Sequence, residues 1–148
     1  MDKILSEYCC GCMLCSSVGE ATLNKDAKGF YHPQFGDEEF LTSVCPCYGN
    51  QLTQMDPSQI WGKHIAVYYG WSSNNEVRYS ASSGGVLTQI ACYLLETKKV
   101  DYIIQTSVDA DEQTKTVTKI SSTVDEVEDC CGSRYSISNP LDVIGNLD

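Results

Sequence analysis

Basic residues are scarce in this chain, which has ten lysine and arginine residues against twenty aspartate and glutamate residues. The formal net charge is therefore −10 at pH 7. Binding to nucleic-acid phosphates depends on lysine and arginine side chains that displace counterions. We therefore expect no nucleic-acid partner, and we expect most of the acidic side chains to lie on a solvated surface.

Long apolar runs are also missing, since no stretch approaches the roughly 20 residues that a membrane-spanning helix needs. Residues 1–7 contain neither the basic region nor the apolar region of a signal peptide, so we expect no export signal. The chain nevertheless has nine cysteines. Without export, these thiols are expected to stay reduced in the cytoplasm and to bind metal rather than form disulfides.

Four of the nine cysteines lie within seven residues. Cys9, Cys12 and Cys15 form a C-x-x-C-x-x-C ladder, in which Gly11 lets the backbone turn tightly. Three thiolates at this spacing can hold one corner of an iron-sulfur cluster. Gly19 stands where a two-cluster ferredoxin has its next cysteine, so the pattern indicates a single cluster.

The fourth ligand must come from elsewhere in the chain. Cys45 directly precedes Pro46, as a remote ferredoxin ligand does, and Cys47 is the nearby alternative. A zinc site remains an alternative, but zinc sites usually pair two separated C-x2–4-C knuckles, and the close pair at positions 45 and 47 is a poor second knuckle. We therefore predict a 4Fe-4S cluster with the ligands Cys9, Cys12, Cys15 and Cys45. Cys10 has no assigned role.

The first part of the chain, residues 1–57, is predicted to be a small ferredoxin-like, metal-bound segment. Residues 20–25 and 29–33 are expected to form two short strands around a turn at residues 26–29. His32 is interpreted as a surface or packing residue rather than a ligand. A linker is expected at residues 55–58.

The second part, residues 58–148, has the pattern of an α+β or α/β domain. A nearly continuous apolar run at residues 64–71 predicts a buried strand, and an apolar stripe from Val86 predicts a helix. Residues 100–108 and 115–120 are predicted strands. Thr123 and Glu126 form a capping-box signature for a short helix that Gly132 would end. We therefore expect a mixed sheet with packed helices in β-α-β-β-α order.

Two polar Gly/Ser segments stand out in this domain, at residues 82–85 and 132–135. Two adjacent glycines at a helix start either allow a ligand to approach the free amides of the first turn or form a tight, serine-capped turn. The only two arginines, Arg78 and Arg134, lie in or beside these segments. Arginine can pair with phosphate and stack on a ring, although pairing with surface carboxylates is the ordinary alternative. Cys130 and Cys131 are interpreted as buried thiols.

The succession of these motifs resembles the coenzyme F420 hydrogenase/dehydrogenase beta subunit family over essentially the whole chain. The motifs are, in order, Cys9-Cys10-Gly11-Cys12-x-x-Cys15, Asp26-x-x-Gly29-Phe30-x-x-Pro33, Cys45-Pro46, Arg78-x-Ser80-x-Ser82-Ser83-Gly84-Gly85-Val86, Val100-Asp101 and Gly132-Ser133-Arg134-Tyr135. The resemblance implies an oxidoreductase module in which a 4Fe-4S cluster exchanges electrons with FAD. The flavin would exchange a hydride with a soluble partner such as the deazaflavin F420.

The resemblance also implies a further C-terminal domain that completes the flavin site, so this chain would be part of a longer enzyme. Its partner would be that domain or a separate redox protein, whose basic face would suit the acidic surface. No catalytic residue is indicated. By the resemblance, the flavin would be bound by Arg78, Ser80, Ser82, Ser83, Gly84, Gly85, Ser133, Arg134 and Tyr135. The alternative function is a non-catalytic scaffold or electron relay in which a cluster, or zinc, only holds the first segment together.

Overall fold

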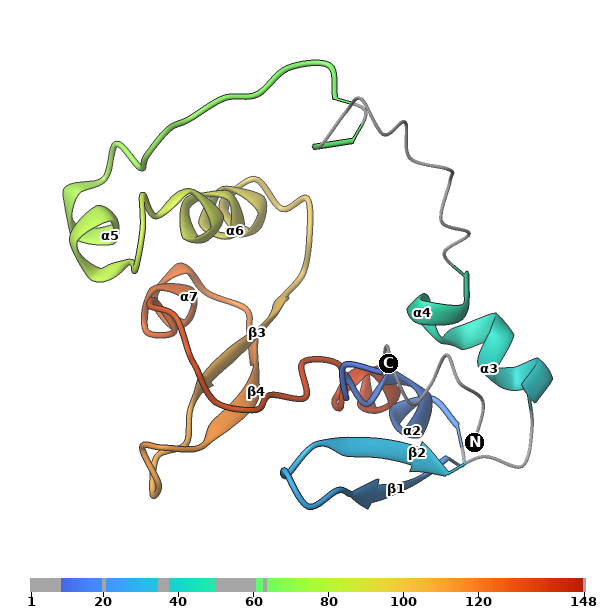
Figure 1. Cartoon of the computed structure of the whole chain (residues 1–148). Helices are drawn as coiled ribbons and strands as arrows, with labels where there is room; N and C mark the ends of the chain where they lie inside the picture. The colour runs from blue at the N-terminus through green and yellow to red at the C-terminus, as the bar shows by residue number, and fades with distance from the viewer. Residues whose placement is uncertain (1–8, 20, 35–37, 50–60, 63, 148) are drawn as a thin grey trace.

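The computed structural model describes residues 9–19, 21–34, 38–49, 61–62 and 64–147. Its class is the predicted α+β, with short helices and two separate two-stranded antiparallel sheets (Figure 1). No helix within these ranges is long and apolar enough to cross a membrane. The predicted linker at residues 55–58 lies outside the described residues.

The predicted N-terminal hairpin is confirmed. Strands β1 (Thr22–Lys25) and β2 (Tyr31–Gln34) pair antiparallel. Asp26 closes the turn between them, because its Oδ1 accepts hydrogen bonds from the main-chain N–H of Lys28 (2.8 Å) and of Phe30 (2.9 Å). This local bonding explains why the turn could be predicted from the sequence.

Three short helices accompany the hairpin, namely α2 (Leu14–Ser17), α3 (Glu38–Val44) and α4 (Pro46–Gly49). The sequence did not predict α3 or α4. Leu41 of α3 is buried against Cys15 of α2, and this pair forms a small core with partly buried neighbours around it. The small core places the cysteine segment between α3 and the hairpin.

The second part of the chain contains α5 (Asn75–Ser80), α6 (Val86–Glu96), β3 (Ile103–Val108), β4 (Thr116–Ser121) and α7 (Val124–Glu128). The β3–β4 pair is antiparallel, as predicted. The capping box of Thr123 and Glu126 opens α7, also as predicted. Helix α6 packs on α7, and Cys92 and Val127, one from each helix, are buried. Helix α7 ends before the predicted stop at Gly132.

The prediction of a buried strand at residues 64–71 is wrong. In the described part of the chain these residues belong to no strand, and their side chains are exposed, with Val67 at 81% and Tyr69 at 91%. A strand needs a partner for its main-chain groups, and β3 and β4 pair only with each other among the described residues. The first strand of the expected β-α-β-β-α order is therefore not formed.

Residues 137–147, here called the bridging segment, connect the two parts of the molecule. The segment contains the 3-10 helix η1 (Ile144–Asn146), which packs against α2. In Figure 1 it leaves the region of β4 and ends, in red, beside α2. Residues more than a hundred positions apart in the sequence therefore lie side by side.

Candidate functional site

Six cysteines line one cavity of about 420 Å³, a volume that includes its opening to solvent. The four predicted cluster ligands are among them, so the structure brings the C-x-x-C-x-x-C ladder and the remote cysteine together. Cys10 and Cys47 also line the cavity, and Cys47 therefore remains an alternative fourth ligand. Apolar side chains complete the wall, including those of Leu23, Pro33 and Leu41.

The backbone conformation of the cysteine segment explains how three sulfurs can face one space. Gly11 has a φ of 69°, a left-handed value that favours glycine. A Cβ added there would lie 3.1 Å from the main-chain oxygen of Tyr31, so the segment passes close to β2. Met13 also has a positive φ, of 66°, directly before α2 carries Cys15 inward. A second left-handed residue thus lies between the last two sulfurs of the ladder.

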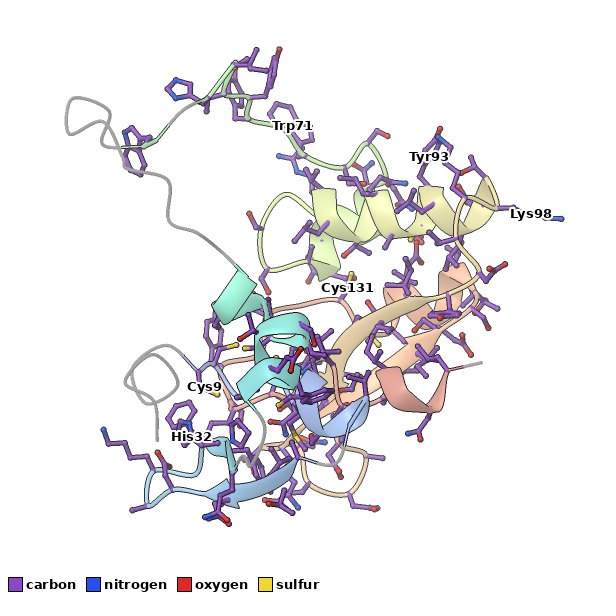
Figure 2. All side chains as sticks on the ribbon, turned by 90° about the vertical axis from the view of Figure 1, so that its right-hand side faces the viewer. Cys9, His32, Trp71, Tyr93, Lys98 and Cys131 are labelled. Carbon is purple, nitrogen blue, oxygen red and sulfur yellow. The ribbon has the colours of Figure 1, made fainter. Side chains whose placement is uncertain are left out.

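Cys45 reaches the cavity from the end of α3. Its main-chain N–H donates a hydrogen bond to the oxygen of Leu41 (2.8 Å). Figure 2 shows Cys9 close to the labelled His32 of β2, in the part of the molecule remote from Tyr93 of α6. His32 itself does not line the cavity, and its Nε2 lies 3.3 Å from Asp26 Oδ2.

The sulfurs influence one another electrostatically. Burial raises the pKa of the Cys9, Cys12 and Cys15 thiols, and repulsion from a Cys45 thiolate adds to the rise in each. Burial, followed by repulsion from Cys45, raises the pKa of Cys47 to about 11. Cys45 therefore lies within electrostatic range of all three sulfurs of the ladder. The close approach of the thiols disfavours their ionised, thiolate form. A bound metal centre would favour this form.

The spacing of the possible donor side chains bears on the kind of metal site. Within the described ranges, no three or more Cys, His, Asp or Glu side chains are grouped closely enough to hold one metal ion. Tetrahedral zinc with Zn–S bonds of about 2.3 Å would require its sulfurs to lie only about 3.8 Å apart. In a 4Fe-4S cluster each thiolate binds a different iron, so the four sulfurs can be more widely spaced.

A second cavity, of about 710 Å³ including its open side, joins the two Gly/Ser segments of the second part. Residues 82–88 form one wall and residues 130–133 the other. The main-chain N–H of Ser133 donates a hydrogen bond to Ser82 Oγ and fixes the two walls together. Five of the residues that the family resemblance indicates for flavin binding line this cavity, namely Ser82, Ser83, Gly84, Gly85 and Ser133.

The glycine pair has structural roles at the start of α6. Gly85 is the N-cap, with a φ of 74° and no side-chain cap hydrogen bond, so the serine cap considered from the sequence is absent. A Cβ on Gly84 would lie 2.7 Å from the main-chain oxygen of Gly70, so this close approach excludes a side chain. The first turn of α6, which carries main-chain N–H groups without helical partners, lines the cavity. The ligand-approach reading and the tight-turn reading, the latter without its serine cap, are therefore both compatible with the structure.

The other four indicated residues do not line the second cavity. Arg78 lies over the Trp71 ring, 4.9 Å from its centroid, so its guanidinium forms a cation–π contact. Tyr135 is 96% exposed, and Ser80 and Arg134 are exposed as well. Neither arginine therefore belongs to the lining of the second cavity.

Sequence reasoning did not assign Cys130 and Cys131 to this site, although both line the cavity. Cys130 is buried, as expected, whereas Cys131 is only half-buried. The Cys131 thiol donates a hydrogen bond to Thr88 Oγ1 in the first turn of α6 (3.4 Å), and Figure 2 shows this residue beside α6. Only the proximity of both cysteines to Gly132 in the sequence could have indicated this position.

Comparison with curated proteins gives no match. Among solved structures, the chain is similar to one chain of the F420-reducing [NiFe] hydrogenase complex from Methanosarcina barkeri, determined with xenon derivatization, at 22% identity and a TM-score of 0.48. The match covers 62% of this chain and 30% of that chain, so this chain spans less than a third of the hydrogenase chain. The sequence model for the N-terminal part of the coenzyme F420 hydrogenase/dehydrogenase beta subunit matches residues 67–145, more than half of the chain. The chain therefore belongs to the coenzyme F420 hydrogenase/dehydrogenase beta subunit family.

Proposed function

We propose that this chain is the electron-transfer module of a larger oxidoreductase, with one 4Fe-4S cluster in the cysteine cavity and FAD at the second cavity. The convergence of Cys9, Cys12, Cys15 and Cys45 on one cavity carries the proposal, because each thiolate can bind one iron there. In the whole enzyme, a deazaflavin such as F420, or another soluble acceptor, would exchange a hydride with the flavin. Membership of the family supports this assignment.

The cluster and the flavin supply the electron and hydride chemistry when bound, and the protein supplies binding and orientation. At the cysteine cavity, the apolar wall around Leu41 limits access of water to the sulfurs. At the second cavity, the residues that lack bulky side chains, such as Gly84 and Gly85, allow a ligand close to the main chain. The free N–H groups of the first turn of α6 suit the phosphates of a dinucleotide, because a helix N-terminus carries partial positive charge.

A structural metal site is the second candidate function. The hydrophobic core of the described N-terminal part is small, since Cys15 and Leu41 form it with a few partly buried neighbours, so packing alone supplies little stability there. A metal bound by the surrounding thiols would supply the missing stabilisation. In that case the chain would need no electron transfer at the cysteine cavity.

Spectroscopy of anaerobically purified protein tests the cluster. A 4Fe-4S cluster gives a broad brown absorption together with about four iron and four sulfide per chain, whereas structural zinc gives a colourless protein. Cys12→Ala should abolish the broad band, and Cys10→Ala, which alters a lining cysteine outside the proposed ligand set, should keep it. Equal losses in the two variants would contradict the ligand assignment.

Flavin binding is tested separately by titrating the apoprotein with FAD and following flavin fluorescence. Ser83→Trp adds a large side chain to the cavity wall and should weaken binding at least tenfold. Ser136→Trp, at an exposed position outside the lining, is the matched control and should bind FAD as the unmodified chain does. Equal affinity in both variants would contradict the proposal that FAD binds in this cavity.

A further inference from the structure

We infer that the bridging segment is a positioning element for the metal-binding cysteines, with Leu141 and Gly145 as its two points of contact. The inference rests on the proposed cluster and adds to it a role for residues about 130 positions away from the ladder. The distal half of the chain would then control the geometry of the cysteine cavity.

The bridging segment contacts the cysteine segment through main-chain hydrogen bonds. The N–H of Leu141 donates to the main-chain oxygen of Cys12 (3.0 Å), the central residue of the ladder. The N–H of Gly145 donates to Ser17 Oγ (2.6 Å) at the end of α2. These two bonds hold the short stretch that contains Met13, with its left-handed backbone, and Cys15. Left-handed backbone at a residue other than glycine persists when its surroundings fix it.

Gly145 fits this contact because it has no side chain. A Cβ at this position would lie 1.6 Å from the main-chain oxygen of Ser17, which no packing adjustment of a side chain could relieve. The φ of Gly145 is not in the left-handed region, so the requirement for glycine is one of space rather than of backbone conformation. Any larger residue must push η1 away from α2.

The other end of the bridging segment is fixed to β4. Thr118 Oγ1 donates a hydrogen bond to the main-chain oxygen of Asn139 (2.8 Å), and Thr116 Oγ1 donates one to the oxygen of Ile137. Thr116 and Thr118 are two residues apart in a strand, so their hydroxyls lie on the same face. The β3–β4 pair therefore supports this end of the bridging segment, and only Pro140 separates Asn139 from Leu141.

The inferred consequence is chemical as well as structural. Hydrogen bonds around the ligands and solvent access to the sulfurs both affect the reduction potential of an iron-sulfur cluster. The hydrogen bond from Leu141 to the main-chain oxygen of Cys12 fixes the backbone that carries the Cys12 sulfur, one of the proposed ligands. Loosening the bridging segment should therefore alter the cluster's potential and expose the sulfurs, even when the rest of the fold is unchanged.

Substitutions at β4 test this inference without touching the cysteine segment. Thr118→Val removes the hydroxyl that holds Asn139 while keeping the side-chain shape, and Thr118→Ser keeps a hydroxyl and should restore the behaviour. Thr106→Val is the matched control, because Thr106 lies opposite Thr118 on β3. Gly145→Ala is a stronger variant at the other end, and Thr118→Val answers the question if Gly145→Ala does not fold.

The first measurement is alkylation of the apoprotein with iodoacetamide under native conditions, followed by mass spectrometry of the peptide that contains Cys12 and Cys15. Thr118→Val should increase the alkylation rate roughly fivefold, the change expected when local opening loses one net hydrogen bond. Thr118→Ser and Thr106→Val should react at the rate of the unmodified chain. Identical rates in all variants, Gly145→Ala included, would overturn the inference.

The second measurement is the midpoint potential of the reconstituted cluster, followed by electron paramagnetic resonance. Thr118→Val should shift this potential, and Thr118→Ser should restore it. A bridging segment that only adds stability would lower the unfolding temperature and leave the potential unchanged, which would overturn the positioning role. A chain that binds no iron would instead refute the proposed function, while the alkylation rates would still decide whether the bridging segment positions the cysteines.

Discussion

The main-chain N–H of Ser133 donates a hydrogen bond to the hydroxyl of Ser82, 51 positions earlier in the chain. This bond joins the loop that precedes α6 to the turn that follows α7. The Cβ position of Gly132 lies 3.8 Å from the same hydroxyl oxygen, so the two walls are in contact beside the bond. The Ser82 side chain therefore contributes to the shape of the second cavity.

Ser82→Ala should separate the two walls of the second cavity. Removing the acceptor leaves the Ser133 N–H without its partner, and the loss of one such bond costs about 1 kcal/mol of stability. Hydrogen exchange at the Ser133 amide should become faster, and any affinity for FAD should fall. Ser136→Ala, at an exposed position outside the cavity lining, is the control. Unchanged exchange at Ser133 in Ser82→Ala would contradict the structural role of the bond.

Thr123→Ala should destabilise α7. The Thr123 hydroxyl accepts a hydrogen bond from the N–H of Glu126 (3.3 Å) and caps the helix. Replacing a threonine cap by alanine costs about 1 kcal/mol. We expect a lower midpoint of denaturant unfolding, with Ser136→Ala, at an exposed position outside any helix, as a control. Equal midpoints for the two variants would show that the capping box contributes nothing.

Acidification should weaken the same helix start. Main-chain hydrogen bonds from Ser122 and Thr123 hold the pKa of the Glu126 carboxyl below its ordinary value of 4.5. Because the folded pKa is the lower one, the stabilisation is present above pH 4.5 and is lost as the pH falls through the folded pKa. Glu126→Gln, which cannot titrate, should lose less thermal stability over this interval than the unmodified chain does. Parallel losses in the two proteins would contradict the assignment.

Alkylation should distinguish the three thiols of the second part of the chain. Cys131 is half-buried, whereas Cys92 and Cys130 are 2% and 6% exposed, so Cys131 should react first. Digestion with trypsin gives one peptide, 79–98, that contains Cys92 and another, 120–134, that contains Cys130 and Cys131. Mass spectrometry can resolve these two peptides. Bound FAD should slow the reaction of Cys131, because this residue lines the proposed cavity. Faster modification of Cys92 than of Cys131 would contradict the burial pattern.

Metal removal should loosen the N-terminal part selectively. Because Cys15 and Leu41 form only a small core there, a chelator that strips the cluster should increase hydrogen exchange across the described residues between 9 and 49. Exchange in β3, β4 and α6 should change little. Uniform protection before and after chelation would mean that packing alone maintains the cysteine cavity.

Local signals explain the parts of the fold that the sequence predicted correctly. The hairpin depends on Asp26, which bonds to main-chain groups two and four residues away, and α7 depends on the reciprocal bonds of Thr123 and Glu126. The run at residues 64–71 has the composition of a strand, but strand formation depends on a partner that a local pattern cannot supply. Its prediction therefore failed although its residue types are typical of β structure.

The candidate site also combines residues that a local pattern indicated with contacts that no local pattern could indicate. Spacing indicated Cys9, Cys12 and Cys15, and the adjacent Pro46 indicated Cys45. All four line one cavity, and their role as ligands stays a prediction. The hydrogen bond from Leu141 to Cys12 could not be predicted, because a main-chain donor has no residue-type signal. The contribution of Cys131 was missed for a related reason, since its contact with Thr88 depends on the packing of α7 against α6.

The exposed run at residues 64–71 affects how this protein must be handled. Its side chains are aromatic, β-branched or small, and it contains neither proline nor an acidic residue that would discourage self-association. Concentrated solutions of the isolated chain should therefore form oligomers and eventually precipitate. Val67→Lys should keep the sample monodisperse in light scattering. Thr22→Lys, at an exposed position in β1, should leave the tendency to oligomerise unchanged.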